Sequence, residues 1–282
     1  MSELRLKRHE TFSIRSGWLE KGINKIAENP YCFRKEEGPR IFGLGSNMVK
    51  SLRYWLSASG LAIFSVQKGA ELTELGKFLL DVDPFLESDF SWWLIHYNLA
   101  TNPNGDTPVI SAFFNMEYSK IEKGHLFNLL KDKFEQEYGS VGAESSLDSD
   151  ISILFKSYYS DDSSNPEDNL NCPLGRLKLV TSIDKKTFIK ETPSYNRLSY
   201  KVVYYSLINC IEANANNCKS VNFEDLFDMP NNPIKVFNLT KTMLIAYLEE
   251  MQRNGLISLV KTAGLNVITV EKTENLRDIY DL

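Results

Sequence analysis

Residues 43–80 read GLGSNMVKSLRYWLSASGLAIFSVQKGAELTELGKFLL and show the clearest succession of secondary-structure elements in the chain. Ser46 is typical of a helix N-cap, because its hydroxyl can accept from backbone N–H groups that lack partners in the first turn. We therefore expect a helix over residues 47–58, ended by Gly60 in the left-handed conformation. One face of this helix is apolar and packs inward, through Val49, Leu52, Trp55 and Leu56.

A β-hairpin and a second helix are expected after Gly60. A strand over 61–66, a turn at Lys68 and Gly69 and a return strand over 71–73 lead to a helix that Thr73 caps and that continues to Leu80. This order is typical of a winged helix, whose recognition helix enters the major groove of DNA while its hairpin touches phosphate or the minor groove. The alternatives are a winged helix that binds protein and a helix–hairpin unit that only packs.

The polar side of the 47–58 helix carries the candidate DNA-binding residues. They are joined by a lysine in the hairpin turn, and the set is Asn47, Lys50, Arg53, Tyr54, Ser57 and Lys68. The whole chain has a net charge of −5, yet residues 1–80 hold 13 Lys or Arg against 8 Asp or Glu, whereas residues 81–282 hold 19 against 29. Because the positive excess coincides with the predicted winged helix, the charge distribution favours a DNA partner.

Composition and periodicity predict a mainly helical α+β protein with small β-hairpins. Apolar residues make up 43% and charged residues 24%, as in globular proteins that bury a core. Further helices are expected over 16–29, 91–100, 110–116, 119–138, 148–158 and 199–213, with a hairpin over 177–189 and a solvated loop over 160–171.

Three domains are expected: a winged helix over 1–82, a central helical domain over 83–190 and a second winged-helix-like domain over 191–282. In the last, a helix over 240–254 precedes strands over 256–260 and 266–270, which flank a turn at 262–264. The helix exposes Glu249 and Glu250 beside Lys241 and Arg253, a mixture that phosphates repel more than they attract. We therefore expect this domain to pack or to bind a partner protein.

The sequence contains none of the motifs GxxxxGK[ST], GxGxxG, HExxH and GxSxG. It therefore predicts no catalytic residue, no metal and no cofactor. Acidic runs are typical of solvated surfaces, and metal binding is the less favoured alternative for Asp148, Asp150, Asp161 and Asp162. His96 lies in the apolar segment 84–100 and is expected to be a core histidine.

The cysteine pattern and the absence of targeting segments predict a cytoplasmic protein. No CxxC pair occurs, so reduced thiols are expected rather than a zinc site, at Cys32, Cys172, Cys210 and Cys218. No signal peptide and no apolar run of about 18 residues is visible, so no membrane contact is expected.

Several segments together resemble the bacterial domain-of-unknown-function family numbered four thousand and seven. They are HETFSIRSGWLEKG (9–22), GLGSNMVKSLRYWLSASGL (43–61), LTELGKFLL (72–80), DPFLESDFSWWLIHYNLA (83–100) and FFN (113–115), with weaker matches at 147–159 and 172–180. That family is encoded beside genes for DNA phosphorothioation, in which sulfur replaces a non-bridging phosphate oxygen, and beside phage-defence genes. The resemblance implies a genomic setting and does not imply a reaction. The partners that it implies are DNA, including sulfur-modified DNA, and other proteins of the same system.

The resemblance also draws attention to the opening motif. His9, Glu10, Arg15 and Trp18 match it, and Ser46 stands where the family tends to have lysine. One interpretation is that His9 and Arg15 clamp a backbone phosphate. The other is that Glu10 and Arg15 pair and fix the N-terminal segment.

Three functional hypotheses follow. The first is an accessory DNA-binding protein of a DNA-modification or phage-defence system, and the second is an assembly subunit that holds an enzyme of that system without touching DNA. The third is a nuclease or other enzyme with an unfamiliar site. A binding protein is favoured over an enzyme, because the charge and the element order point to a ligand surface and no catalytic motif is present.

Overall fold

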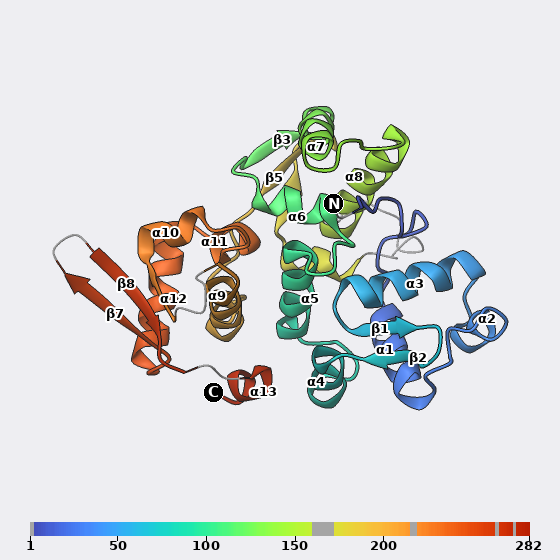
Figure 1. The fold of residues 1–282 in the computed structure, drawn as a ribbon, viewed down its shortest axis with the longest axis horizontal. Coiled ribbons are helices and arrows are strands. Elements are labelled where there is room, and N and C mark those ends of the chain that lie inside the picture. The colour runs from blue at the N-terminus through green and yellow to red at the C-terminus, as the bar shows by residue number, and fades with distance from the viewer. Residues whose placement is uncertain (1–2, 160–171, 215–218, 263–264, 273–274) are drawn as a thin grey trace. The chain divides into compact units, whose positions relative to one another are not determined.

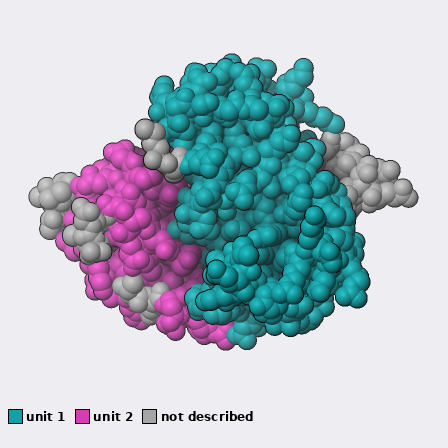
Figure 2. Space-filling model, turned by 45° about the vertical axis from the view of Figure 1, so that its right-hand side comes forward, with its two compact units in different colours: residues 1–113, 118–191 teal, residues 114–117, 192–282 magenta. Residues whose placement is uncertain are grey.

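The computed structural model describes residues 3–159, 172–214, 219–262, 265–272 and 275–282. The chain forms two compact units, residues 1–113 with 118–191, and residues 114–117 with 192–282 (Figure 2). Residues 160–171, which include Asp161 and Asp162, lie outside the described residues, as do Cys218 and most of the turn expected at 262–264.

The N-terminal part of the first unit follows the order helix, helix, helix, hairpin, helix (Figure 1). Its elements are α1 (Trp18–Glu28), α2 (Gly38–Phe42), α3 (Ser46–Ala58), β1 (Ala62–Ser65), β2 (Gly69–Leu72) and α4 (Glu74–Val82). β1 and β2 pair antiparallel, with Ala62 opposite Leu72. α1 and α3 pack closely at Gly22, where a Cβ atom would lie 2.6 Å from Leu56 Cδ1.

The rest of the first unit is helical with one small sheet. It comprises α5 (Asp89–Thr101), all but the last two residues of α6 (Pro108–Asn115), β3 (Lys120–Glu122), α7 (Lys123–Tyr138), α8 (Glu144–Tyr158), the 3₁₀ helix η2 (Pro173–Leu177), β4 (Val180–Ser182) and β5 (Thr187–Lys190). The strands are antiparallel in the order β3-β5-β4. His96 on α5 is fully buried with Nδ1 2.8 Å from the Tyr158 hydroxyl, which confirms the expected core histidine.

The second unit packs helices around a second three-stranded sheet of order β6-β8-β7. It comprises α9 (Tyr200–Asn214), β6 (Ser220–Asn222), α10 (Phe223–Asp228), α11 (Pro233–Phe237), α12 (Lys241–Arg253), β7 (Ile257–Thr262), β8 (Leu265–Val270) and α13 (Leu276–Asp281). Leu244, Tyr247, Leu248 and Met251 of α12 are buried, so this helix supplies much of the core of the unit.

The mixed α+β class is confirmed, with helices and small antiparallel sheets throughout the described residues. Gly60 is left-handed with φ 70°, and the Thr73 hydroxyl accepts from Gly76 N, both as expected. The winged-helix interpretation and the three-domain division stay predictions.

Two local predictions are wrong. Ser46 is the first residue of α3 rather than its N-cap, because Gly45 holds the cap position and its carbonyl accepts from Val49 N. Residues 120–122 are not helical, because they pair with β5, and the helix begins only at Lys123. Tertiary pairing overrides local helix propensity at this point.

Two findings bear on the environment of the chain. Within the described residues, no helix has the length and apolar character that crossing a membrane requires. Cys32, Cys172 and Cys210 are buried thiols, and burial raises the pKa of Cys32 to about 11 and that of Cys172 to about 12. These thiols therefore stay protonated at neutral pH.

Candidate nucleic-acid interface

The segment before α1 is a basic arm, residues 5–15, that a buried carboxylate holds in place. Asp150 of α8 accepts from Lys7 N and from His9 Nε2, both at 2.8 Å. The Thr11 N–H donates to His9 Nδ1 at 3.1 Å, so Nδ1 carries no hydrogen and Nε2 is the donor to Asp150. His9 and Asp150 are 2% and 8% exposed, so this pair is a structural tether and not a solvent-facing site.

The arm has an unusual backbone. Lys7, Glu10 and Thr11 have φ angles of 57°, 50° and 70°, in the left-handed region that residues other than glycine seldom occupy. Such conformations persist where surrounding contacts fix them, and they concentrate at functional sites. Asp150 accepts hydrogen bonds from Lys7 N and from His9. It therefore fixes the backbone of the arm between Lys7 and Glu10, two of the left-handed residues.

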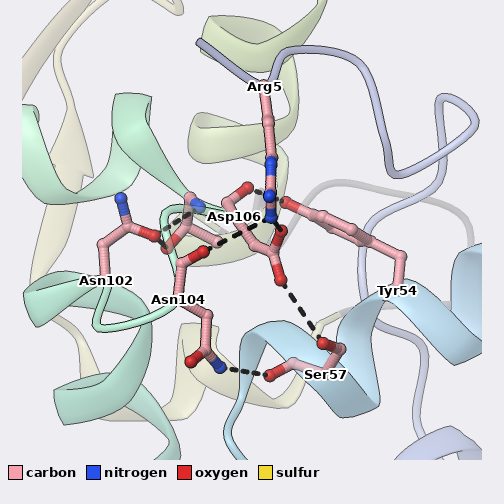
Figure 3. A network of polar contacts seen from close by, with 7 residues as sticks. Arg5, Tyr54, Ser57, Asn102, Asn104 and Asp106 are labelled. Carbon is pink, nitrogen blue, oxygen red and sulfur yellow. Dashed lines mark hydrogen bonds and ion pairs between the residues drawn. The ribbon is translucent and has the colours of Figure 1, made fainter. Parts of the chain in front are cut away.

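A second buried carboxylate, Asp106, connects the arm to α3 (Figure 3). Its Oδ1 accepts from Arg5 Nη1 at 3.2 Å and its Oδ2 accepts from Ser57 Oγ at 3.3 Å. The Tyr54 hydroxyl donates to the Asp106 carbonyl oxygen at 2.8 Å. Burial, followed by the charges of Asp150 and Asp106, raises the pKa of Tyr54 well above its usual value, so Tyr54 remains a donor.

Asp106 is itself positioned by the loop that follows α5. This loop begins at Asn102, which is left-handed with φ 53° and whose Oδ1 accepts from Thr107 N at 2.7 Å. Asn104 contributes its carbonyl oxygen, 3.5 Å from Arg5 Nη1 (Figure 3). The loop therefore presents the Asp106 carboxylate to the arm and to α3 together.

The arm and α3 enclose a cleft of about 580 Å³. Its lining includes two half-buried aromatic rings and two carboxylates beside five cationic side chains. It consists of Arg5, Lys7, Arg8, Glu10, Lys50, Arg53, Tyr54, Ser57, Phe64 and Asp106. Asp106 is paired with Arg5, and Glu10 lies 3.9 Å from Lys50 Nζ. Lys7, Arg8 and Arg53 therefore leave the cleft with a surplus of positive charge.

The Arg53 guanidinium lies over the Phe64 ring, 4.8 Å from its centroid. Arg53 is exposed while Phe64 of β1 is half-buried, so the pair joins α3 to the hairpin at the cleft wall. A guanidinium stacked on an aromatic ring stays fully charged and keeps its N–H donors available at its edge.

The structure brings four of the sequence-predicted residues into this cleft, namely Lys50, Arg53, Tyr54 and Ser57. Asn47 is exposed one turn earlier, and its Oδ1 accepts from Lys50 Nζ at 3.3 Å. Lys68 is exposed in the hairpin turn and does not line the cleft.

The two candidates from the opening motif lie elsewhere. His9 is buried against Asp150, so the expected phosphate contact of His9 is not available in this structure. Arg15 is half-buried, with its guanidinium 5.3 Å from the Phe12 centroid and 5.5 Å from that of Trp18. The alternative pair of Glu10 and Arg15 does not form, because Glu10 faces Lys50.

Sequence reasoning missed the basic arm and the contacts that both carboxylates make with it. The signal for the arm was present, since Arg5, Lys7 and Arg8 form the run RLKR and contribute to the positive excess of residues 1–80. Asp106 and Asp150 gave no local signal, because each meets the arm across more than one hundred residues of chain.

The fold and the cleft define a mixed α+β protein with a basic, partly aromatic cleft next to a helix–hairpin unit. The chain belongs to the family described as "Protein of unknown function (DUF4007)", whose model matches residues 6–280. No curated relative matches the sequence.

Two solved structures share the fold: a magnesium ion-bound SspB crystal structure and an SspB crystal structure. Each is 24% identical in sequence and has a TM-score of 0.82, and the match covers 98% of this chain and 86% of the other. At this identity the likeness establishes the fold alone.

The magnesium in one of these structures raises the question of a cation site in this chain. Among the residues that the structure describes, no group of three or more His, Cys, Asp or Glu side chains is placed to hold a metal. Asp106 and Asp150 both accept hydrogen bonds from the arm, and Asp106 also accepts from α3. We assign no metal chemistry to the described residues.

Proposed function

We propose that this chain is an accessory DNA-binding protein of a bacterial DNA-modification or phage-defence system of the phosphorothioation type. It binds DNA phosphates in the cleft between the basic arm and α3. The observation that carries the proposal is the surplus of cations on this cleft, in a chain whose net charge is −5. Lys and Arg side chains that neutralise phosphates release condensed counterions, which is the main source of affinity for nucleic acid.

Family membership supports the setting. The resemblance of the chain to DUF4007 implies a place beside phosphorothioation and phage-defence genes, and the family match extends over nearly the whole chain. The order of α3, β1, β2 and α4 supports the winged-helix interpretation of the same region. Lys50 and Arg53 belong to this helix–hairpin unit, and both line the cleft.

The test is a salt titration of DNA binding by the full chain, measured by fluorescence anisotropy. Arg8→Gln removes one exposed cation from the cleft, and Lys133→Gln removes one exposed cation from α7, where Lys133 pairs with Glu137. We expect Arg8→Gln to weaken binding and to reduce the salt slope by about 1, and Lys133→Gln to change neither. No binding at low salt, or binding that is insensitive to salt, would refute the proposal.

A second candidate function is supported by the second unit. An apolar pocket of about 130 Å³ lies between α12 and the β7–β8 hairpin, and its lining includes Ile245, Leu248, Val260 and Ile268. Ile245 and Val260 are 41% and 48% exposed, and Glu249 is the charged residue of the lining. This arrangement suits an apolar side chain of a partner protein with a neighbouring cation facing Glu249, as an assembly subunit requires.

Co-purification with the products of neighbouring genes separates the two functions. If the assembly function holds, Ile245→Asp abolishes capture of a partner and leaves salt-dependent DNA binding unchanged. Capture that survives this change excludes the pocket as the docking site.

A further inference from the structure

Several polar side chains of α3 are engaged by neighbouring segments of the chain. The Tyr54 hydroxyl and Ser57 Oγ both donate to Asp106, and Lys50 faces Glu10 of the arm. A recognition helix in the major groove presents such positions to base edges. Tyr54 and Ser57 are engaged by the Asp106 loop instead, so α3 forms one wall of a cleft rather than a projecting helix.

The walls of this cleft combine two kinds of group. Lys7 and Arg8 are exposed cations on the arm, and the Arg53 guanidinium lies over the Phe64 ring in the lining of the same cleft. A charged groove that follows the backbone, together with aromatic and guanidinium planes on which bases stack, is the arrangement by which proteins hold single strands. Bases inside a duplex are already stacked on their neighbours and cannot use such a plane.

The size of the cleft agrees with an unstacked nucleotide. Its volume is about 580 Å³. Sites that enclose one small ligand measure roughly 300–1,000 Å³. A duplex needs a protruding element or an open surface, because its bases are read within the grooves.

We infer that the cleft receives an unpaired nucleotide of single-stranded DNA, with phosphates against Lys7 and Arg8 and a base on the pair of Arg53 and Phe64. This inference rests on the proposed function and names the form of DNA that the site takes. The Asp106 network holds the floor of the cleft in place, since it fixes Arg5, Tyr54 and Ser57 at once.

The experiment compares one labelled strand of about 16 nucleotides, alone and annealed to its complement, with the full chain at low salt. We expect the single strand to bind at least about tenfold more tightly, because stacking of one base changes affinity by roughly five- to a hundredfold. Phe64→Leu keeps an apolar side chain and removes the ring. It should weaken single-strand binding by about fivefold or more and narrow the difference between single-strand and duplex affinity.

The matched control is Phe33→Leu. The ring centroid of Phe33 lies 5.3 Å from that of Phe64 in the same aromatic cluster, but Phe33 does not line the cleft. If Phe64→Leu lowers the melting temperature too far, Arg53→Gln tests the same stacking surface from the exposed side. Equal or tighter binding of the duplex overturns this inference and leaves the proposed function standing. Failure of both DNA forms to bind refutes the inference and the proposed function together.

Discussion

Lys50 and Arg53 are the two side chains through which α3 contributes positive charge to the cleft. Both are exposed, so the double variant Lys50→Ala with Arg53→Ala opens no cavity. Surface changes of this kind shift stability by only about 0.5 kcal/mol each. We expect nearly unchanged melting and a salt slope of DNA binding that falls by about 1 for each phosphate contact that is lost.

Leu52→Ala is the contrasting variant on the same helix. Leu52 is fully buried, so its truncation leaves a cavity and should cost roughly 2–5 kcal/mol of unfolding free energy. Denaturant unfolding and salt-dependent affinity, measured on both variants, separate the two roles. A double variant that melts like the wild type and keeps the full salt slope would show that α3 does not contact phosphate.

At the scale of elements, the β1–β2 hairpin depends on one close approach. Gly69 has φ 81°, and a Cβ atom there would lie 2.5 Å from the Pro30 carbonyl oxygen, which accepts from Ala70 N at 2.7 Å. Gly69→Ala should therefore destabilise the protein by more than the roughly 1 kcal/mol that a left-handed alanine costs by itself.

Gly43→Ala isolates the conformational part of that cost. Gly43 also has a positive φ, 64°, but a Cβ atom there would meet nothing within 4 Å. The difference in unfolding free energy between the two variants measures the clash with Pro30. Equal destabilisation would mean that the hairpin is not held by this contact.

The elements also show what the sequence could and could not predict. Local apolar content located α1, α3, α5, α9 and α12, because each buries apolar side chains within its own length. β3 and β6 were missed, because strands of three residues become regular only through partners far along the chain. For the site, the α3 cations followed from local spacing, whereas the role of His9 depends on Asp150 and was beyond any local pattern.

At the scale of the molecule, buried titratable groups give the first unit a characteristic pH dependence. Burial lowers the pKa of Lys190 to about 7, so unfolding takes up a proton over the range between about 7 and the ordinary lysine value. The contribution of Lys190 to the free energy of unfolding is therefore largest at a pH above the ordinary lysine value. This contribution decreases as the pH falls toward 7. Cys32 and Cys172 have pKa values raised to about 11 and about 12, so their contribution is lost as the pH rises above about 9.

The melting temperature of the first unit should therefore rise from pH 7 toward about 9 and fall above it. Burial raises the pKa values of Tyr54 and Tyr158 well above the usual value. These two groups therefore make the melting temperature fall more steeply with increasing pH on the alkaline side. Differential scanning calorimetry across this range measures the profile. Lys190→Met should flatten the rising side and leave the falling side in place, and a profile that keeps its rise in this variant contradicts the assignment.

The tethering of the arm by Asp106 and Asp150 has a consequence for the order in which the molecule comes into being. The hydrogen bonds that attach the arm to Asp106 and Asp150 join residues 101 to 143 positions apart in the sequence. In contrast, α1, α3 and the β1–β2 hairpin contact one another over much shorter sequence separations. Long loops close late during folding, because their ordering entropy is spent before their contacts form. On the ribosome, the arm is synthesised before α8 and can be fixed in place only once α8 has emerged. A nascent chain that ends before α8 therefore lacks the assembled cleft, and with it the proposed affinity for nucleic acid, while messenger RNA and ribosomal RNA surround it.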